Sequence, residues 1–142
     1  MDLRSKDAIE SSKQHDIDMN NTLIAEFMGV KTITEAELYS ILRQNRENGF
    51  IHTPQAYTID ELKYHSSWDS LMPVVEKINL LDDYRYTVYI ASMDTKIVDN
   101  ISGNVIVEID CKHSIDELRQ SVYEAVVEFI KEHKIAEYNE RQ

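Results

Sequence analysis

One short segment gathers side chains that are able to bind a small anion: Lys63, Tyr64, His65, Ser66, Ser67 and Trp68. An apolar stretch with helical spacing follows, so the segment is expected to lie at the start of a helix. The first turn of a helix presents backbone N–H groups and the positive end of the helix dipole, which attract anions. The pattern therefore predicts a site for a small anionic or nucleotide ligand, with Tyr64 and Trp68 able to stack on a base.

Helix capping offers a simpler interpretation of the same segment. Ser66 is expected to cap the helix, and Asp69 then falls at the third helical position. The Asp69 carboxylate would compete with a phosphate for the same N–H groups. On this interpretation Trp68 fills the core and His65 forms a local hydrogen bond, and both interpretations stay open.

The other reactive side chains form no recognisable catalytic or metal-binding motif. Cys111 and His113 stand two residues apart at the end of a predicted strand, but no nucleophile motif surrounds them, so Cys111 is expected to be a buried structural residue. The five histidines lack metal-ligand spacing, and three glycines cannot supply a phosphate-binding loop. The sequence predicts a protein that is not an enzyme and needs no metal or cofactor.

Charge and composition exclude several classes of partner. The chain has 142 residues and a net charge of −11, which opposes binding to a nucleic-acid duplex or to an anionic membrane. No apolar run reaches the length of about 20 residues that spans a bilayer. With one cysteine there is no intrachain disulfide, and the N-terminus lacks a signal-peptide apolar region, so the protein is expected in the cytoplasm.

Capping boxes and hydrophobic periodicity predict the elements that must position these residues. Residues 1–20 are mostly polar and are expected to form a loose or weakly helical extension, residues 21–135 a single α+β domain, and residues 136–142 a frayed tail. The expected helices cover 21–29, 34–48, a brief turn at 58–61, 67–81 and 114–133. In the fourth of these, Met72, Val75 and Ile78 are expected to face the core.

Two segments alternate as strands do, residues 84–93 and residues 105–111. The residues between them are rich in turn formers, although Lys96-Ile97-Val98 could pair briefly. Val105, Val107, Ile109 and Cys111 are expected to face inward. The fold class is therefore α+β, with an antiparallel β-hairpin or small sheet sandwiched by helices. A lone hairpin exposes its edges, which together with eight tyrosines predicts a homo-oligomer, a dimer or higher.

Three blocks of the chain resemble a known family. NTLIAEFMG (21–29), KYHSSWDSLMPVVEKI (63–78) and YEAVVEFIK (123–131) are similar to the phage ABA sandwich domain, found in phages and prophages of Bacteroidetes hosts. Where the family commonly has tryptophan this chain has Val30 and Ser70, and Glu132-His133 replaces a Trp-Tyr. The resemblance implies a fold and a viral context, and it implies no catalytic residues.

Two functions follow as hypotheses. The first is a non-catalytic phage or prophage accessory protein, in its most concrete form a counter-defence protein that sequesters a nucleotide-type immune signal at Lys63–Trp68. The second is an acidic protein–protein inhibitor that occupies the basic surface of a host factor. A small hydrolase using His65 or Cys111 is a third possibility, which lacks any motif in its favour.

Overall fold

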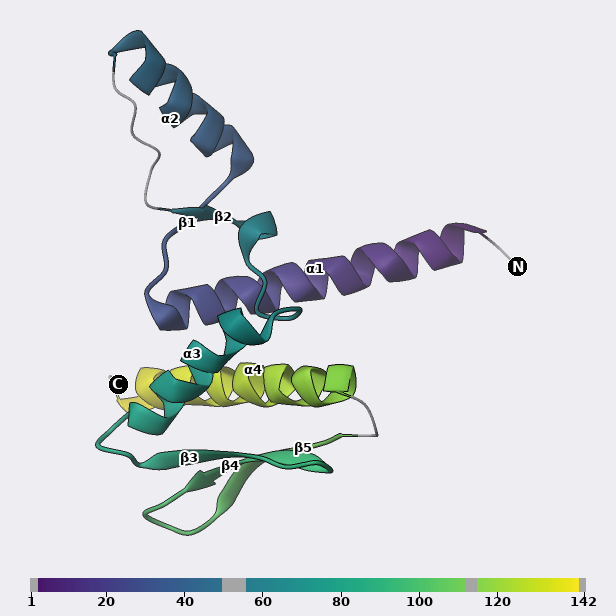
Figure 1. Cartoon of the computed structure of the whole chain (residues 1–142), viewed down its shortest axis with the longest axis vertical. Coiled ribbons are helices and arrows are strands. Elements are labelled where there is room, and N and C mark those ends of the chain that lie inside the picture. Colours follow the sequence, from purple (N-terminus) through teal and green to yellow (C-terminus); the bar gives the residue numbers. More distant parts are fainter. Residues whose placement is uncertain (1–2, 50–55, 112–114, 141–142) are drawn as a thin grey trace. The chain divides into compact units, whose positions relative to one another are not determined.

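The computed structural model of the chain describes residues 3–49, 56–111 and 115–140 (Figure 1). They form helices, one small parallel sheet and one antiparallel sheet, which confirms the α+β class. The chain divides into two compact units, Met1–Leu62 and Lys63–Gln142. The single domain predicted over residues 21–135 stays a prediction.

The first unit is dominated by one long helix, α1 (Leu3–Met28). Of the two alternatives predicted for residues 1–20, a loose or a weakly helical extension, the described part is helical, and the short helix predicted over 21–29 continues back through it. Extending a helix adds one hydrogen bond per residue and avoids the cost of nucleation, so a segment with few apolar anchors can join it. Gly29 ends the helix at φ +73°, a left-handed conformation that glycine adopts without strain.

The rest of the first unit forms short elements whose caps the sequence predicted. Strand β1 (Thr32–Ile33) pairs in parallel with β2 (Tyr57–Thr58). Helix α2 (Glu35–Glu47) begins at Thr34, whose Oγ1 accepts the Glu37 N–H at 3.1 Å. Residues 50–57 contain Pro54 and alternate only weakly, which predicts a loop or a short edge strand, but only Ala56 and Tyr57 of that segment lie within the described residues.

A single 3₁₀ turn, η1 (Ile59–Glu61), follows β2 and lies near α1. Thr58 donates its N–H and its hydroxyl to the Glu61 carboxylate, at 3.1 and 2.9 Å, and these hydrogen bonds lower the pKa of Glu61. Asn21 of α1 donates to the Leu62 carbonyl at 3.2 Å. This bond, between groups that are both buried, ties the end of the unit to the middle of α1.

The second unit contains a three-stranded antiparallel sheet in the order β3 (Tyr86–Ile90), β4 (Asp94–Asp99), β5 (Val105–Asp110). The predicted strands 84–93 and 105–111 both exist, but they do not pair with each other, because β4 lies between them. The residues of β4 were expected to form mainly turns, because two of the three inward side chains of the strand, Thr95 and Asp99, are polar. Both are buried and hydrogen-bonded, so the strand tolerates them.

A bulge in β5 changes which of its residues face inward. The register shifts between Ile97 and Val98, so that Val98 pairs with Val105 rather than with Ile106. The shift moves Val105 out of the core, where it is 48% exposed, whereas Val107 and Cys111 are buried as predicted.

Helices α3 (Trp68–Leu80) and α4 (Ile115–Glu140) lie on the same side of this sheet (Figure 1). Val75 and Ile78 of α3 are buried as predicted, but Met72 is 36% exposed and was wrongly placed in the core. Helix α4 runs beyond the predicted end at His133. It shares the core of the unit with α3 and β4, and its buried side chains include Val122, Val126, Phe129 and Ile130.

The connection from α3 to β3 is a left-handed turn. Asp82, Asp83 and Tyr84 have φ of 48°, 58° and 64°. Two contacts with the end of β4 stabilise the turn: Asn100 donates to the Tyr84 carbonyl at 2.9 Å, and Arg85 pairs with Asp99 at 3.1 Å.

Candidate functional site

The predicted anion site lies where expected, at the start of α3, but its cap is displaced by one residue. Ser67, not Ser66, is the N-cap, and its Oγ accepts the Ser70 N–H at 3.4 Å. Asp69 stands in the first turn, as expected for a helix N-terminus. The hydrogen bond is long, so the cap only partly satisfies the first turn.

The six predicted site residues differ in how far they reach solvent. Lys63 and Ser66 are exposed, and His65, Ser67 and Trp68 are half-buried. Tyr64 is only 8% exposed, so it offers little surface on which a base could stack. The His65 ring meets the ring of Tyr123 edge-on, with centroids 6.3 Å apart. Capping and packing thus account for Tyr64, His65 and Ser67, whereas Lys63, Ser66 and part of Trp68 face outward.

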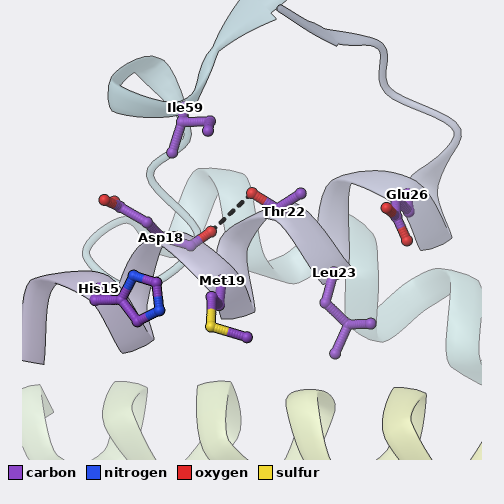
Figure 2. Close-up of a pocket in the computed structure, with 7 residues that line it drawn as sticks. All are labelled: His15, Asp18, Met19, Thr22, Leu23, Glu26 and Ile59. Atoms are coloured by element: carbon purple, nitrogen blue, oxygen red, sulfur yellow. Dashed lines mark hydrogen bonds between the residues drawn. The ribbon is translucent and has the colours of Figure 1, made fainter. Parts of the chain in front are cut away.

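A separate feature, which sequence reasoning missed, is a groove along α1 in the first unit (Figure 2). Its volume is about 450 Å³. We call it the α1 groove; its lining consists of His15, Asp18, Met19, Thr22, Leu23, Glu26 and Ile59. Six of these residues lie along one strip of α1, and Ile59 comes from η1. An open, mostly apolar concavity with a few polar groups is the usual form of a binding site.

The groove combines an apolar surface with carboxylates. Met19, which is 58% exposed, and Leu23 supply apolar side chains from consecutive turns of α1, as Figure 2 shows. Asp18 and Glu26 are separated by about 12 Å along the helix axis, at 1.5 Å per residue. The Gln14 amide donates to Asp18 Oδ1 at 2.9 Å, and the Thr22 hydroxyl donates to the Asp18 carbonyl at 2.8 Å.

This arrangement selects against an anionic ligand. Two carboxylates within the groove repel phosphate and attract an ammonium or guanidinium group. The apolar residues between them favour a ligand that also carries an alkyl or aromatic group. The groove is therefore suited to a segment that combines apolar and basic side chains.

A second, smaller concavity lies on α2. Its volume is about 370 Å³, and its lining consists of Tyr39, Leu42, Arg43, Arg46 and Glu47. Tyr39 is 72% exposed and Leu42 is 40% exposed. Arg43 pairs with Glu47 at 3.6 Å, and both side chains are well exposed. We call this surface the α2 face.

The described residues contain no group of three or more side chains suited to holding a metal ion. Cys111 is buried, as predicted, and His52 and His113 lie outside the described residues. Within the described part of the chain, no helical run combines the length and the hydropathy needed to span a bilayer.

A helical repeat in the sequence marks the α1 groove, but most of the residues in that repeat are polar. Its α1 residues recur every three or four positions from His15 to Glu26, which is the repeat of one helical face. Only Met19 and Leu23 among them are apolar, so the strip lacks a helical repeat of apolar residues. Its first half was therefore assigned to the polar extension.

Comparison with protein-family models, with curated proteins and with solved structures finds no match to this chain. The resemblance to the phage ABA sandwich domain therefore stays a prediction.

Proposed function

We propose that this chain is a non-catalytic protein-binding module, and that its α1 groove takes a partner segment carrying both apolar and basic side chains. The observation that supports this proposal is the pairing of exposed Met19 with Asp18 and Glu26 in one groove. The activity corresponds to the acidic protein–protein inhibitor predicted from the net charge of −11.

Binding in the groove gains free energy from two sources. Covering Met19 and Leu23 removes apolar surface from water, at about 25 cal/mol per Å². A lysine or arginine placed over Asp18 or Glu26 adds a charge pair, which speeds association and selects against acidic partners. Because Glu26 is exposed and Asp18 is half-buried, salt is expected to weaken binding without abolishing it.

A peptide titration tests the proposal. The probes are two helical peptides of equal length, one of leucine and lysine and one of leucine and glutamate, followed by fluorescence anisotropy. The basic peptide should bind and the acidic one should not. Met19→Gln, which adds no charge to the groove, should weaken binding by about tenfold or more, because a buried methionine contributes about 1.5–3 kcal/mol.

The matched control is Ile9→Gln. Ile9 is 55% exposed on the same helix and does not line the groove, so its substitution should leave the affinity unchanged. Equal affinity of the wild-type protein and Met19→Gln, or equal binding of both peptides, would refute the proposal.

A second candidate function rests on the outward-facing part of the predicted anion site. Lys63 and Ser66 are exposed beside the first turn of α3, and Trp68 is half-buried there. These residues support the proposal that a nucleotide-type signal binds at this helix start, in a phage or prophage counter-defence role that the sequence resemblance suggests.

Trp68 is the only tryptophan, so its fluorescence is a direct reporter for this second proposal. Titration with cyclic nucleotides and with ADP-ribose should change the emission. Lys63→Ala should weaken that response, whereas Lys13→Ala, on exposed α1 surface, should not. An emission spectrum unchanged by every nucleotide would retire this candidate.

A further inference from the structure

Helix α2 is unusual because no residue along its length is buried, although the structure describes all of it. An amphipathic helix ordinarily buries its apolar stripe. Here Tyr39 and Leu42 remain exposed beside Arg43 and Arg46, so the α2 face combines an aromatic ring, an aliphatic side chain and two guanidinium groups.

The α2 face has the chemistry that the α1 groove accepts. Both surfaces carry apolar residues, and their net charges are opposite: the α2 face has two arginines against the single carboxylate of Glu47, and the groove has Asp18 and Glu26. The α2 face is short enough to fit, since Tyr39 to Arg46 covers about 10 Å of helix axis and the groove strip about 16 Å. The ion pair that holds Arg43 to Glu47 is well exposed, so exchanging it costs little.

We infer that α2 of a second copy of this chain occupies the α1 groove, so that two chains form a dimer in which each inserts its α2 into the other. The inference rests on the proposed function of the groove and names one occupant for it. Reciprocal exchange fills both grooves and closes the assembly, as is usual for symmetric dimers.

The groove of a chain is not filled by its own α2. No residue of α2 lines it. Strand β1 ends at Ile33, and the next residue, Thr34, caps α2, so the pairing of β1 with β2 fixes where α2 begins. A second copy is therefore the source of the helix that fits.

A charge-exchange experiment on the full chain tests the inference by sedimentation velocity. One variant reverses the α2 face, with Arg43→Glu and Arg46→Glu. Another reverses the groove, with Asp18→Lys and Glu26→Lys. The wild-type protein should be a dimer, and each variant alone should dissociate at least about tenfold more readily, because like charges then face each other.

Mixing the two variants provides the decisive observation. In a mixed pair the acidic α2 meets the basic groove, and the unaltered α2 meets the unaltered groove, so both contacts are restored. The equimolar mixture should form a heterodimer at wild-type concentrations, which also shows that both variants are folded. A charge-matched control, Lys13→Glu with Lys131→Glu on exposed surface outside both features, should leave the dimer intact.

Three outcomes would overturn the inference. These are a monomeric wild-type protein, a dimer that both variants retain, and a mixture that stays monomeric although each variant gives a wild-type circular dichroism spectrum. If the protein is a monomer and its own α2 can be cross-linked to its groove, the occupant is the chain's own helix and not that of a second copy.

The peptide titration separates this failure from failure of the proposed function. If the basic peptide still binds through Met19 while the protein is monomeric, only the choice of occupant is wrong. If the peptide does not bind and the mixture still forms a heterodimer, the groove serves self-association alone. In the α2-reversed variant the groove is open, so the peptide should bind it more tightly than it binds the wild-type dimer.

Discussion

The contact between α4 and the sheet includes a buried pair of hydroxyl groups, whose coupling a double-mutant cycle can test. Ser121 and Thr95 are 2% and 0% exposed, and their oxygens lie 3.0 Å apart. Ser121 Oγ also lies 3.0 Å from the carbonyl oxygen of Ile109 in β5. One hydroxyl hydrogen cannot serve both bonds at once, so the network is complete only when Thr95 donates to Ser121 and Ser121 donates to Ile109.

Removing one hydroxyl leaves the other buried group short of a partner. Ser121→Ala or Thr95→Val alone should lower the free energy of unfolding by about 1–3 kcal/mol. The double variant replaces both groups with apolar ones of similar shape, which can be nearly neutral. We therefore expect the double variant to be more stable than the sum of the single effects predicts, by about 1–2 kcal/mol.

Urea unfolding followed by Trp68 fluorescence measures the cycle, since Trp68 lies in the same unit as both hydroxyls. The dependence of free energy on urea should keep its slope. Ser12→Ala, at an exposed position of α1, should change stability by less than about 0.5 kcal/mol. Single effects that add within about 0.5 kcal/mol would show that the two hydroxyls are not coupled, which would contradict the packing of α4 on β4 and β5.

Three further predictions concern the strands and their connections. Tyr84→Gly should raise the melting temperature measured by calorimetry by about 2–4 °C, because it relieves about 1 kcal/mol of left-handed strain at a residue that is 68% exposed. The control Tyr89→Gly, within β3, should lower the melting temperature. The hydrogen bond from Arg85 lowers the pKa of Asp99, so the stability it provides is complete above the unfolded pKa near 4 and is lost as the pH falls through the lower folded value. Urea midpoints measured against pH should therefore fall on the acid side, and less steeply in Asp99→Asn; identical acid limbs would contradict the pairing. Asn79 Oδ1 accepts the Val88 N–H on the outer edge of β3 at 2.8 Å, so Asn79→Ala should lower the free energy of unfolding by about 1 kcal/mol and increase aggregation, measured by light scattering. Unchanged scattering would show that this edge does not aggregate when the hydrogen bond is absent.

Local signals in the sequence predicted the ends of several elements correctly. Thr34 caps α2 because a hydroxyl three residues before Glu37 reaches its N–H, and that geometry depends on nothing outside the turn. Gly29 ends α1 for an equally local reason. Alternation likewise revealed β3 and β5, whose inward residues are mostly apolar.

The failures occurred where a long-range partner decides the outcome. Strand β4 was missed because the burial of Thr95 and Asp99 depends on Ser121 and Arg85, which are distant in sequence. Val105 was placed in the core because a bulge cannot be read from alternation. The length of α1 was missed because the polar residues before Asn21 continue a helix that they would not start.

The candidate sites likewise include one that local signals predicted and features that depend on long-range packing. The start of α3 was predicted as a helix terminus, since the capping residues before it are local signals. That Tyr64 is buried beside it depends on packing in three dimensions. The α1 groove is formed by α1 together with Ile59, a residue distant in sequence, so no local pattern could define it.

The most direct test of the central claim, that the α1 groove takes a basic and apolar segment, is a methyl NMR titration. The α2-reversed variant, labelled with ¹³C at its methionine methyl groups, would be titrated with the leucine–lysine peptide. We predict that the Met19 signal shifts and saturates, while the signals of exposed Met72 and Met93 in the other unit stay in place. A Met19 signal that does not move, or that moves equally with the leucine–glutamate peptide, would contradict the account.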